Sequence, residues 1–424
     1  PRGFTGGQLD REQPGRSPGA SHSPVTSGAG QRASGAAHME ESVFLEIRRR
    51  MQSGLLIIRE PKAGNLPVDI TMSPGSLEIK SCQACKMISF PAEVRIVPSS
   101  CRGLQYIVGD GLHVRLQVQA DSNTKLISTL SESLKAQKSC IFYCQSCGEI
   151  IIKEWTFLRV LPLPSENWSA LVEEWCCHAN PFANSALHPQ NNDCFLGHTY
   201  FLVNSGSESH VPGPEIVHSE TEHSASERGP TLKSKENARV ICKRCKAMLG
   251  ETVSSGTTKY YITEMIIQPS GTNFDMIPRS QFVQNIIAQC LVELSSSRST
   301  FRFRMQGHDG KVYILMWLLN SDTLLVESMG NSASSSVFTL FEDNLRPDSK
   351  SSGTWNAVKV LYHPCIKNRN KDLADAWEND IGVHPLTFPS KTCLELLLIL
   401  SLSNACLPPS LRCMNSFQVA FLKM

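Results

Sequence analysis

Two Cys-x-x-Cys pairs carry the clearest chemistry in this sequence. Cys144 and Cys147 are separated by two residues, as are Cys242 and Cys245, and each pair follows an apolar residue and precedes a glutamate. This spacing lets a tight turn present both sulfurs to one ion, and two such turns complete a tetrahedral shell around zinc. The pattern predicts a structural zinc site, since four thiolates leave no position for a catalytic water. Two unrelated buried pairs, or a redox dithiol, are the alternatives.

The segment 161–198 is rich in tryptophan, proline and side chains that could bind metal. One hypothesis makes it a docking segment that presents a surface loop to a partner protein. The partner-binding residues would then be Trp168, Trp175, Cys177 and His178. A second hypothesis is an internal metal site, which adjacent cysteines disfavour because both rarely face one ion without strain. Its ligands would come from Cys176, Cys177, His178, His188, Cys194 and His198. Packing of the tryptophans in a core is the third.

Cys393, within the run Thr392-Cys393-Leu394, is the third candidate. A cysteine whose pKa is close to neutral is both a good nucleophile and a good leaving group, as thioester exchange requires. No histidine or aspartate lies beside it, so any activating group is distant in sequence, with His363 and His384 as candidates by residue type. The leucine-rich run that follows favours a helix with its apolar face inward. A buried, inert cysteine is the alternative.

Strands and helices that would position these residues are indicated by the period of the apolar residues. Strands are predicted at Val43–Ile47, Val94–Ile96, Leu104–Val108, Leu112–Val118, Tyr260–Ile267 and Phe417–Phe421. A three-stranded meander is predicted from Phe301–Met305, Lys311–Leu319 and Thr323–Glu327, with turns at His308–Gly310 and Ser321–Asp322. Helices are predicted at Val283–Leu294, Asp372–Trp377 and Thr392–Leu400. Without regular βαβ alternation, the fold class is α+β, rich in antiparallel sheet.

Composition divides the chain into four parts. Residues 1–41, rich in Gly, Ser, Arg and Pro, are predicted to be a disordered extension, with Met39 as the natural start. Residues 42–203 form a β-rich N-terminal half, 204–239 a polar disordered linker, and 240–424 an α+β C-terminal half with a tail at 388–424. The zinc site would join the two β-rich halves across the linker, because the cost of closing a loop grows slowly with its length.

The overall composition excludes several classes of protein. Hydrophobic residues make up 41% of the chain, enough for real cores, and the net charge of +2 gives no reason to expect a nucleic-acid partner. No run approaches the roughly 20 apolar residues of a membrane helix, so no membrane partner is predicted. No secretory signal is visible, so reduced, metal-binding cysteines and a cytoplasmic location are expected, with the nucleus as a second location.

Several stretches resemble the HECT-like ubiquitin-protein ligases that bind a mitotic ubiquitin-conjugating enzyme. They are Val97–Tyr106, Leu161–Trp168, Cys242–Glu251, the Thr392-Cys393-Leu394 run and Ser416–Met424, within a likeness that covers residue 42 to the end. The resemblance implies an enzyme, a ubiquitin-protein transferase that accepts ubiquitin from the conjugating enzyme. It would modify substrates and itself for proteasomal degradation, with Cys393 as the thioester site.

The same resemblance implies further partners. Phe421, four residues from the end counting the last as one, would contact the transferred ubiquitin. The family segment that corresponds to 274–291 contacts the conjugating enzyme, so Phe282 and Ile286 become candidate contacts, with a core helix as the alternative. Cyclin-type substrates are also a family association.

A rival function comes from the docking segment. It is similar to a motif in a protein that docks onto a metallo-β-lactamase-fold pre-mRNA 3′-end cleavage nuclease. There the motif's cysteine ligates the partner's zinc, and that position falls on Cys177. The alternative to a ligase is therefore a non-catalytic chaperone or assembly factor for such a nuclease.

Overall fold

A computed structural model describes eleven stretches of the chain. They are residues 43–59, 69–80, 85–121, 133–163, 188–204, 214–217, 238–254, 256–274, 276–328, 353–365 and 370–424. All belong to one unit, Met39–Met424. The predictions for residues 1–41, for most of 204–239, and for Trp168, Trp175, Cys177 and His178 lie outside the described residues.

The largest sheet has eleven strands in the order β23-β24-β21-β20-β1-β2-β8-β6, with β7 added to β8 and β19 joining β20 to β22. Its strands are β1 (Val43–Arg48), β2 (Ser53–Ile58), β6 (Val94–Ile96), β7 (Arg102–Ile107), β8 (Gly111–Ala120), β19 (Arg302–Gly307), β20 (Val312–Ser328), β21 (Gly353–Pro364), β22 (Val383–Phe388), β23 (Cys413–Met414) and β24 (Phe417–Lys423). The β19–β22 pair is parallel and the other pairs are antiparallel. Its central β1–β20 pair joins the beginning of the described chain to its C-terminal part.

Three smaller sheets complete the described strands. They are β3 (Asp69–Ser73), β4 (Ser76–Lys80) and β5 (Cys85–Ser89); β9 (Ser139–Cys144), β10 (Ile150–Thr156) and β18 (Met265–Pro269); and β11 (Arg159–Pro162), β12 (Asp193–Leu196), β13 (Tyr200–Asn204), β14 (Glu215–Val217), β15 (Arg239–Ile241), β16 (Met248–Ser254) and β17 (Thr257–Tyr261). The β9–β18 and β13–β17 pairs cross the predicted linker. Backbone hydrogen bonds therefore join the two halves in three sheets, and the four cysteines are one link among several.

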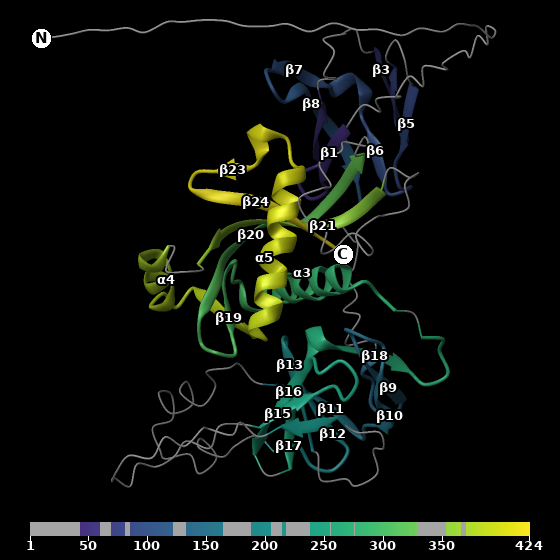
Figure 1. Ribbon diagram of the computed structural model, residues 1–424. Helices are drawn as coiled ribbons and strands as arrows, with labels where there is room; N and C mark the ends of the chain where they lie inside the picture. Colours follow the sequence, from purple (N-terminus) through teal and green to yellow (C-terminus); the bar gives the residue numbers. More distant parts are fainter. Residues whose placement is uncertain are drawn as a thin grey trace, which may run out of the picture. The chain divides into compact units, whose positions relative to one another are not determined.

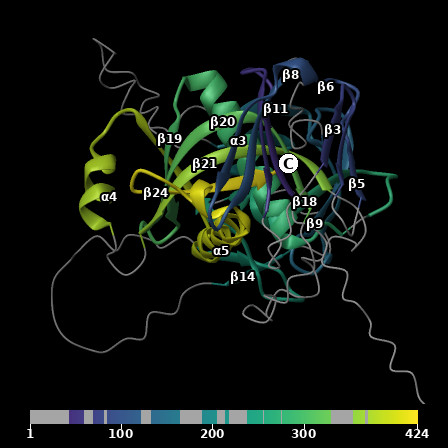
Figure 2. The same cartoon turned by 90° about the horizontal axis from the view of Figure 1, so that it is seen from above.

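Three α-helices are described: α3 (Arg279–Arg298), α4 (Lys371–Glu378) and α5 (Ser390–Cys406). Apolar residues at spacings of three and four give α3 and α5 buried stripes, and both helices pack on strands β20 and β24 (Figure 1). Figure 2 shows α5 end-on beside β24. Short 3₁₀ turns are η1 (Pro98–Ser100), η2 (Ile262–Glu264) and η6 (Pro409–Leu411). The predicted β-rich, largely antiparallel character is confirmed.

The two faces of β24 bury different cores, because successive strand residues point to opposite sides of a sheet. Ala420 and Leu422 pack in the core that contains α3 and α5. Val419 and Phe421 pack in the core on the other face, where the Phe421 and Phe44 rings lie 6.1 Å apart. Successive side chains of β24 therefore lie on opposite faces of the sheet and belong to two different cores.

Two predicted elements are wrong in their boundaries. The expected strand Tyr260–Ile267 is β17 and β18 separated by η2, because the chain leaves one sheet at Tyr261 and enters another at Met265. The expected turn at Ser321–Asp322 lies inside β20, whose pairing with β21 shifts register there. A bulge of this kind bends a strand without ending it. None of the described helices is both long and apolar enough to span a membrane.

Candidate functional site

The two Cys-x-x-Cys pairs adopt the same backbone turn. The amide of Cys144 donates to the carbonyl oxygen of Glu149 at 2.8 Å, and that of Cys242 donates to Ala247 at 2.9 Å. In each turn the residue after the second cysteine, Gly148 or Lys246, has a left-handed φ of 72° or 59°. Its amide donates back to the carbonyl of the first cysteine at 2.8 and 2.9 Å, respectively. Each turn thus directs both of its cysteine sulfurs to one side.

The four sulfurs converge on one point. Sγ of Cys144 lies 3.6 Å from that of Cys245, Sγ of Cys147 lies 3.7 Å from that of Cys242, and all four lie within 4.8 Å of one another. A tetrahedron with zinc–sulfur bonds of about 2.3 Å sets neighbouring sulfurs about 3.8 Å apart. These four cysteines, which we call the four-cysteine site, could therefore hold a metal ion.

Backbone amides surround the sulfurs of the four-cysteine site. N–H groups of Ser146 and Cys147 face the Cys144 sulfur, and that of Ala247 faces the Cys245 sulfur. Burial raises the pKa of Cys144. Burial also acts to raise the pKa of Cys245, but the Ala247 amide and the neighbouring thiols outweigh it and lower that pKa. Amide donors stabilise thiolates and orient them, as the outer partners of metal ligands do.

Cys393 lies in the fourth position of α5 and is 1% exposed. Its amide donates to the carbonyl oxygen of Pro389 at 3.1 Å, so it is engaged in the helix. Burial and the Asp309 carboxylate raise the pKa of the Cys393 thiol to about 12. At neutral pH this thiol therefore stays protonated, which makes it a poor nucleophile. The expectation of an accessible, activated thiol is wrong for this conformation, and a role for Cys393 as ubiquitin acceptor stays a prediction.

Phe421 does not form a common site with Cys393. It is 2% exposed and packs beside Phe44, whereas Cys393 belongs to the core on the opposite face of the sheet. The alternation of β24 forces this separation, because Ala420 and Leu422 occupy the face toward α5. In the structure Phe421 is a core residue, and its contact with a transferred ubiquitin stays a prediction.

Phe282 and Ile286, predicted to contact the conjugating enzyme, are each 8% exposed. Both belong to the core that contains Cys144 and Cys242, while Val283 faces the core of α5. Helix α3 therefore packs against both cores. This agrees with the alternative interpretation, in which the helix is part of the core. The two side chains are buried in this conformation, and their contact with the conjugating enzyme stays a prediction.

The docking segment is described only at its two ends. Cys194 is fully buried in β12, and His188 contacts Thr257 and Ser254 at 3.1 Å through Nδ1. Among the described residues, the four-cysteine site is a group that could hold a metal ion. Neither Cys194 nor His188 belongs to such a group. Partner binding by Trp168, Trp175, Cys177 and His178 falls outside the described residues and stays a prediction.

A buried ionic cluster, which the sequence predictions missed, lies between the four-cysteine site and α5. Arg279, at the first position of α3, donates through Nη2 to Glu264 Oε1 at 2.8 Å and through Nε to Glu395 Oε2 at 2.9 Å. Burial disfavours the cation, but the two carboxylates outweigh this and raise the pKa of Arg279. The three charged side chains are at most 22% exposed. We call them, with Thr392 and Gln145, the Arg279 cluster.

A sequence signal for this cluster did exist. Glu264 stands alone within the apolar run Tyr260–Ile267, and Glu395 interrupts the leucines of α5. A carboxylate within a buried element requires a counter-ion or hydrogen-bond donors, because an isolated buried charge is very costly. What the sequence does not specify is that one arginine, Arg279, pairs with both.

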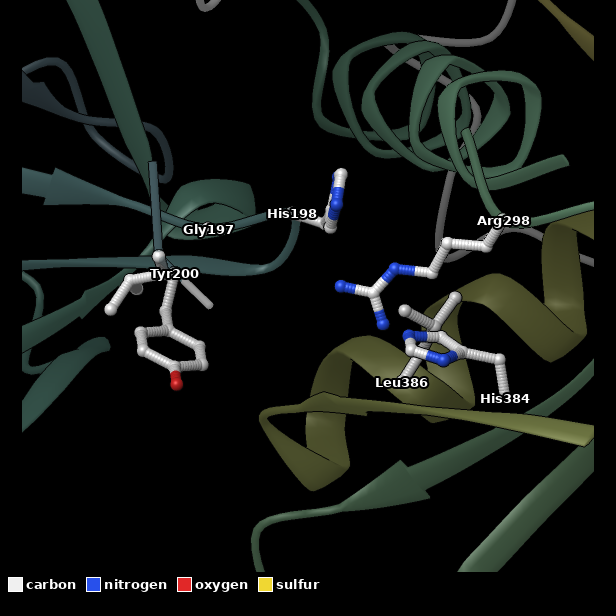
Figure 3. A pocket seen from close by; sticks show the side chains of 7 residues that line it. Gly197, His198, Tyr200, Arg298, His384 and Leu386 are labelled. Atoms are coloured by element: carbon white, nitrogen blue, oxygen red, sulfur yellow. The ribbon is translucent and has the colours of Figure 1, made fainter. Parts of the chain in front are cut away.

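His384, named as a possible partner of Cys393, faces a separate small pocket. The pocket is lined by Leu163, Gly197, His198, Tyr200, Arg298, His384 and Leu386. In Figure 3 the Arg298 guanidinium extends between His198 and His384. Burial, together with Arg298 and His198, lowers the pKa of His384 to about 4. His363 instead contacts Phe417, with ring centroids 4.2 Å apart and the two rings tilted by 51°. No histidine is among the groups that shift the pKa of Cys393 in the described part of the chain.

Acidification is expected to destabilise the fold through His384. Its ordinary pKa is 6.5 and its folded pKa is about 4, so between these values the unfolded chain binds more protons. The free energy of unfolding should therefore fall as the pH decreases through this window, by about 1–2 kcal/mol after allowance for partial exposure. Urea unfolding at about pH 7 and about pH 4.5 measures this loss. A His384→Gln variant should lose less stability on acidification than the wild type. An unchanged pH dependence in the variant would contradict the prediction.

The chain is similar in sequence to a known protein family and to several known proteins. The chain matches the model of the family described as "HECT-like Ubiquitin-conjugating enzyme (E2)-binding" over residues 46–419. It is 60% identical to an E3 ubiquitin-protein ligase of Bos taurus over 389 residues, which cover 92% of this chain and 100% of the relative. The ligase of the same name from Homo sapiens is 61% identical with the same coverage. An uncharacterized protein of Saccharomyces cerevisiae is 20% identical over 302 residues, 69% of this chain and 72% of the relative.

No solved structure matches the chain. The family match spans the four-cysteine site, the Arg279 cluster and the helix that carries Cys393. The resemblance found in the sequence is confirmed. The chain belongs to the HECT-like ubiquitin-conjugating enzyme (E2)-binding family.

Proposed function

We propose that this protein is a ubiquitin-protein ligase: it binds a ubiquitin-conjugating enzyme charged with ubiquitin and promotes transfer of the ubiquitin to substrates and to itself. The observation that carries the proposal is the identity of 60–61%, over the whole length of the relatives, with proteins named as E3 ubiquitin-protein ligases. The family's description adds binding of the conjugating enzyme.

Two routes of transfer are chemically possible. In the first, the Cys393 thiolate attacks the thioester carbonyl, the conjugating enzyme's cysteine leaves as a thiolate, and a substrate amine then attacks the new thioester. In the second, the substrate amine attacks the thioester on the conjugating enzyme directly. The burial of Cys393 and its pKa of about 12 oppose the first route in the described conformation. We therefore favour direct transfer, with the protein holding the charged conjugating enzyme.

Replacement of Cys393 separates the two routes. Under direct transfer, a Cys393→Ala variant should discharge a charged conjugating enzyme and modify itself within about two-fold of the wild-type rate, because no bond to Cys393 forms. Gel assays with and without reductant measure discharge and any reducible adduct. Cys290→Ala is the matched control, since Cys290 is 3% exposed in the same core.

The outcomes of this assay test the route of transfer and the ligase function itself. A reducible ubiquitin adduct on the wild type, absent from Cys393→Ala and kept by Cys290→Ala, would contradict direct transfer and establish the thioester route. Failure to bind or discharge any member of a panel of charged conjugating enzymes would overturn the ligase function itself.

The four-cysteine site is proposed to hold structural zinc. Four thiolates at tetrahedral spacing suit zinc, and a closed shell leaves no position for substrate. When bound, the ion would supply cohesion between the turn after β9 and the turn after β15. Proteasomal degradation, cyclin-type substrates and a cytoplasmic or nuclear location belong to the ligase proposal as expectations from the sequence, whereas a nuclease partner belongs to the alternative function, a non-catalytic assembly factor.

A further inference from the structure

One residue of the first cysteine turn reaches the Arg279 cluster. Gln145 lies between Cys144 and Cys147 in sequence and is 1% exposed. Its side-chain oxygen accepts from Arg279 Nη1 at 3.3 Å, and its side-chain amide donates to the Ile277 carbonyl at 3.0 Å. Its backbone amide donates to the carbonyl of Glu264 at 3.0 Å. The shape of this turn thus helps to define the position of both Arg279 and Glu264.

The opposite side of the cluster holds the first turn of α5. The Thr392 hydroxyl donates to Glu264 Oε1 at 2.6 Å and accepts from Arg279 Nη2 at 3.0 Å. Glu395, one helical turn further, binds Arg279 Nε at 2.9 Å. Cys393 lies between these two anchored residues and is covered by the core. The Arg279 cluster therefore helps to hold this turn closed, together with the contacts of Ser390 to His308 at 3.2 Å and the packing of Cys393 in the core.

We propose that the four-cysteine site and the first turn of α5 are coupled through the Arg279 cluster, so that loss of the metal unlocks this turn and exposes the Cys393 thiol. Without an ion, the cysteine turn that carries Gln145 loses its central constraint. Arg279 and Glu264 then lose fixed partners, and a buried polar cluster that is only partly satisfied stabilises its surroundings much less. Opening of one turn requires far less free energy than unfolding of the whole chain.

The chemical consequence is a thiol whose reactivity reports on the metal. A buried neutral thiol reacts slowly, whereas an exposed one with a lower pKa reacts readily with electrophiles. Chelation of the metal at the four-cysteine site would thus make Cys393 reactive, although Cys393 is not itself a ligand. This inference concerns the accessibility of Cys393 and is independent of which route ubiquitin transfer takes.

Site-resolved alkylation of the purified full chain tests the coupling. The protein is treated with iodoacetamide with or without a zinc chelator, metal release is followed by a colorimetric indicator, and the labelling rate of each cysteine is measured by mass spectrometry. We expect chelation to raise the labelling rate of Cys393 about ten-fold or more, while Cys290 stays protected. Cys290, 3% exposed in the same core, reports global unfolding.

Thr392→Val removes the hydroxyl from the cluster and keeps the side-chain shape. Cys393 in this variant should label faster even with metal bound, and chelation should add less than in the wild type. Ser401→Ala is the matched control on α5, because the Ser401 hydroxyl bonds Leu397 O at 2.8 Å and the Tyr362 side chain, both outside the Arg279 cluster. Its labelling should equal that of the wild type.

Three results would overturn the coupling. The first is an unchanged Cys393 rate after the metal has been released. The second is a rise of Cys393 and Cys290 together, which indicates global unfolding. The third is a purified chain that holds no metal and in which Cys393 is nevertheless labelled as slowly as Cys290, because the turn would then be closed without an ion.

Discussion

Cys242→Ser should abolish stoichiometric zinc binding and lower the free energy of unfolding by at least about 4 kcal/mol. Cys242 is fully buried and its sulfur lies 3.7 Å from that of Cys147, so a hydroxyl there leaves the other three thiols without a complete shell. The metal binding energy is folding energy when the site forms only in the folded chain. Elemental analysis of the purified protein and urea unfolding measure the two effects.

Cys140→Ser is the matched control for this change. Cys140 is buried in the same core as Cys242, but its sulfur contacts the Trp155 carbonyl at 3.3 Å and belongs to no metal-binding group in the described chain. A serine there keeps a donor, so we expect a loss of only about 1 kcal/mol and unchanged metal content. Equal damage from both variants, or full zinc content in Cys242→Ser, would mean that the four cysteines merely pack together.

Arg279→Met should lower the free energy of unfolding by about 3–5 kcal/mol. The change leaves the carboxylates of Glu264 and Glu395 without their shared cation, and their side chains are only 7% and 16% exposed. Removing one partner of a buried ion pair is costly because the other charge stays buried and uncompensated. Urea unfolding at neutral pH measures the loss.

A second substitution shows whether the loss comes from the stranded charge. Glu264→Gln in the Arg279→Met background removes one uncompensated carboxylate and should recover part of the stability, so the two changes should be strongly non-additive. Arg244→Met is the exposed control: Arg244 is 65% exposed and lies 3.8 Å from Glu149, so its loss should cost under about 1 kcal/mol. Additive effects of the first pair would show that Arg279 acts through packing of its stem alone.

Local patterns in the sequence predicted several features correctly. The spacing of Cys144, Cys147, Cys242 and Cys245 was sufficient to expect one cluster, because each turn is built by a few consecutive residues and each contributes two sulfurs. The helical period from Val283 to Leu294 predicted α3, and the apolar run after Cys393 predicted α5. The boundary errors at η2 and within β20 arose because a change of sheet or a bulge depends on the neighbouring strands.

The sequence did not predict in which direction the candidate functional side chains point. A Thr-Cys run fits an exposed thioester site or a buried helix equally well, and the structure buries Cys393 because the apolar residues of α5 cover the sheet on that side. Likewise, Phe282 and Ile286 belong to an amphipathic helix in either case. Which surface that helix covers depends on a second core that forms around β9 and β18.

The cysteine-bearing turns, the apolar period of the main helices and membership of the E2-binding family could all be predicted from the residues alone, because each depends on residues close together in the chain or on their order. The fold was needed to show that Phe421 and Cys393 lie on opposite faces of one sheet, and that Arg279 pairs with both Glu264 and Glu395. Thr392 and Glu264 are 128 residues apart, and the pairing of distant strands brings them to 2.6 Å. Burial and the choice of counter-ion are properties of such long-range contacts, which is why no local pattern specifies them.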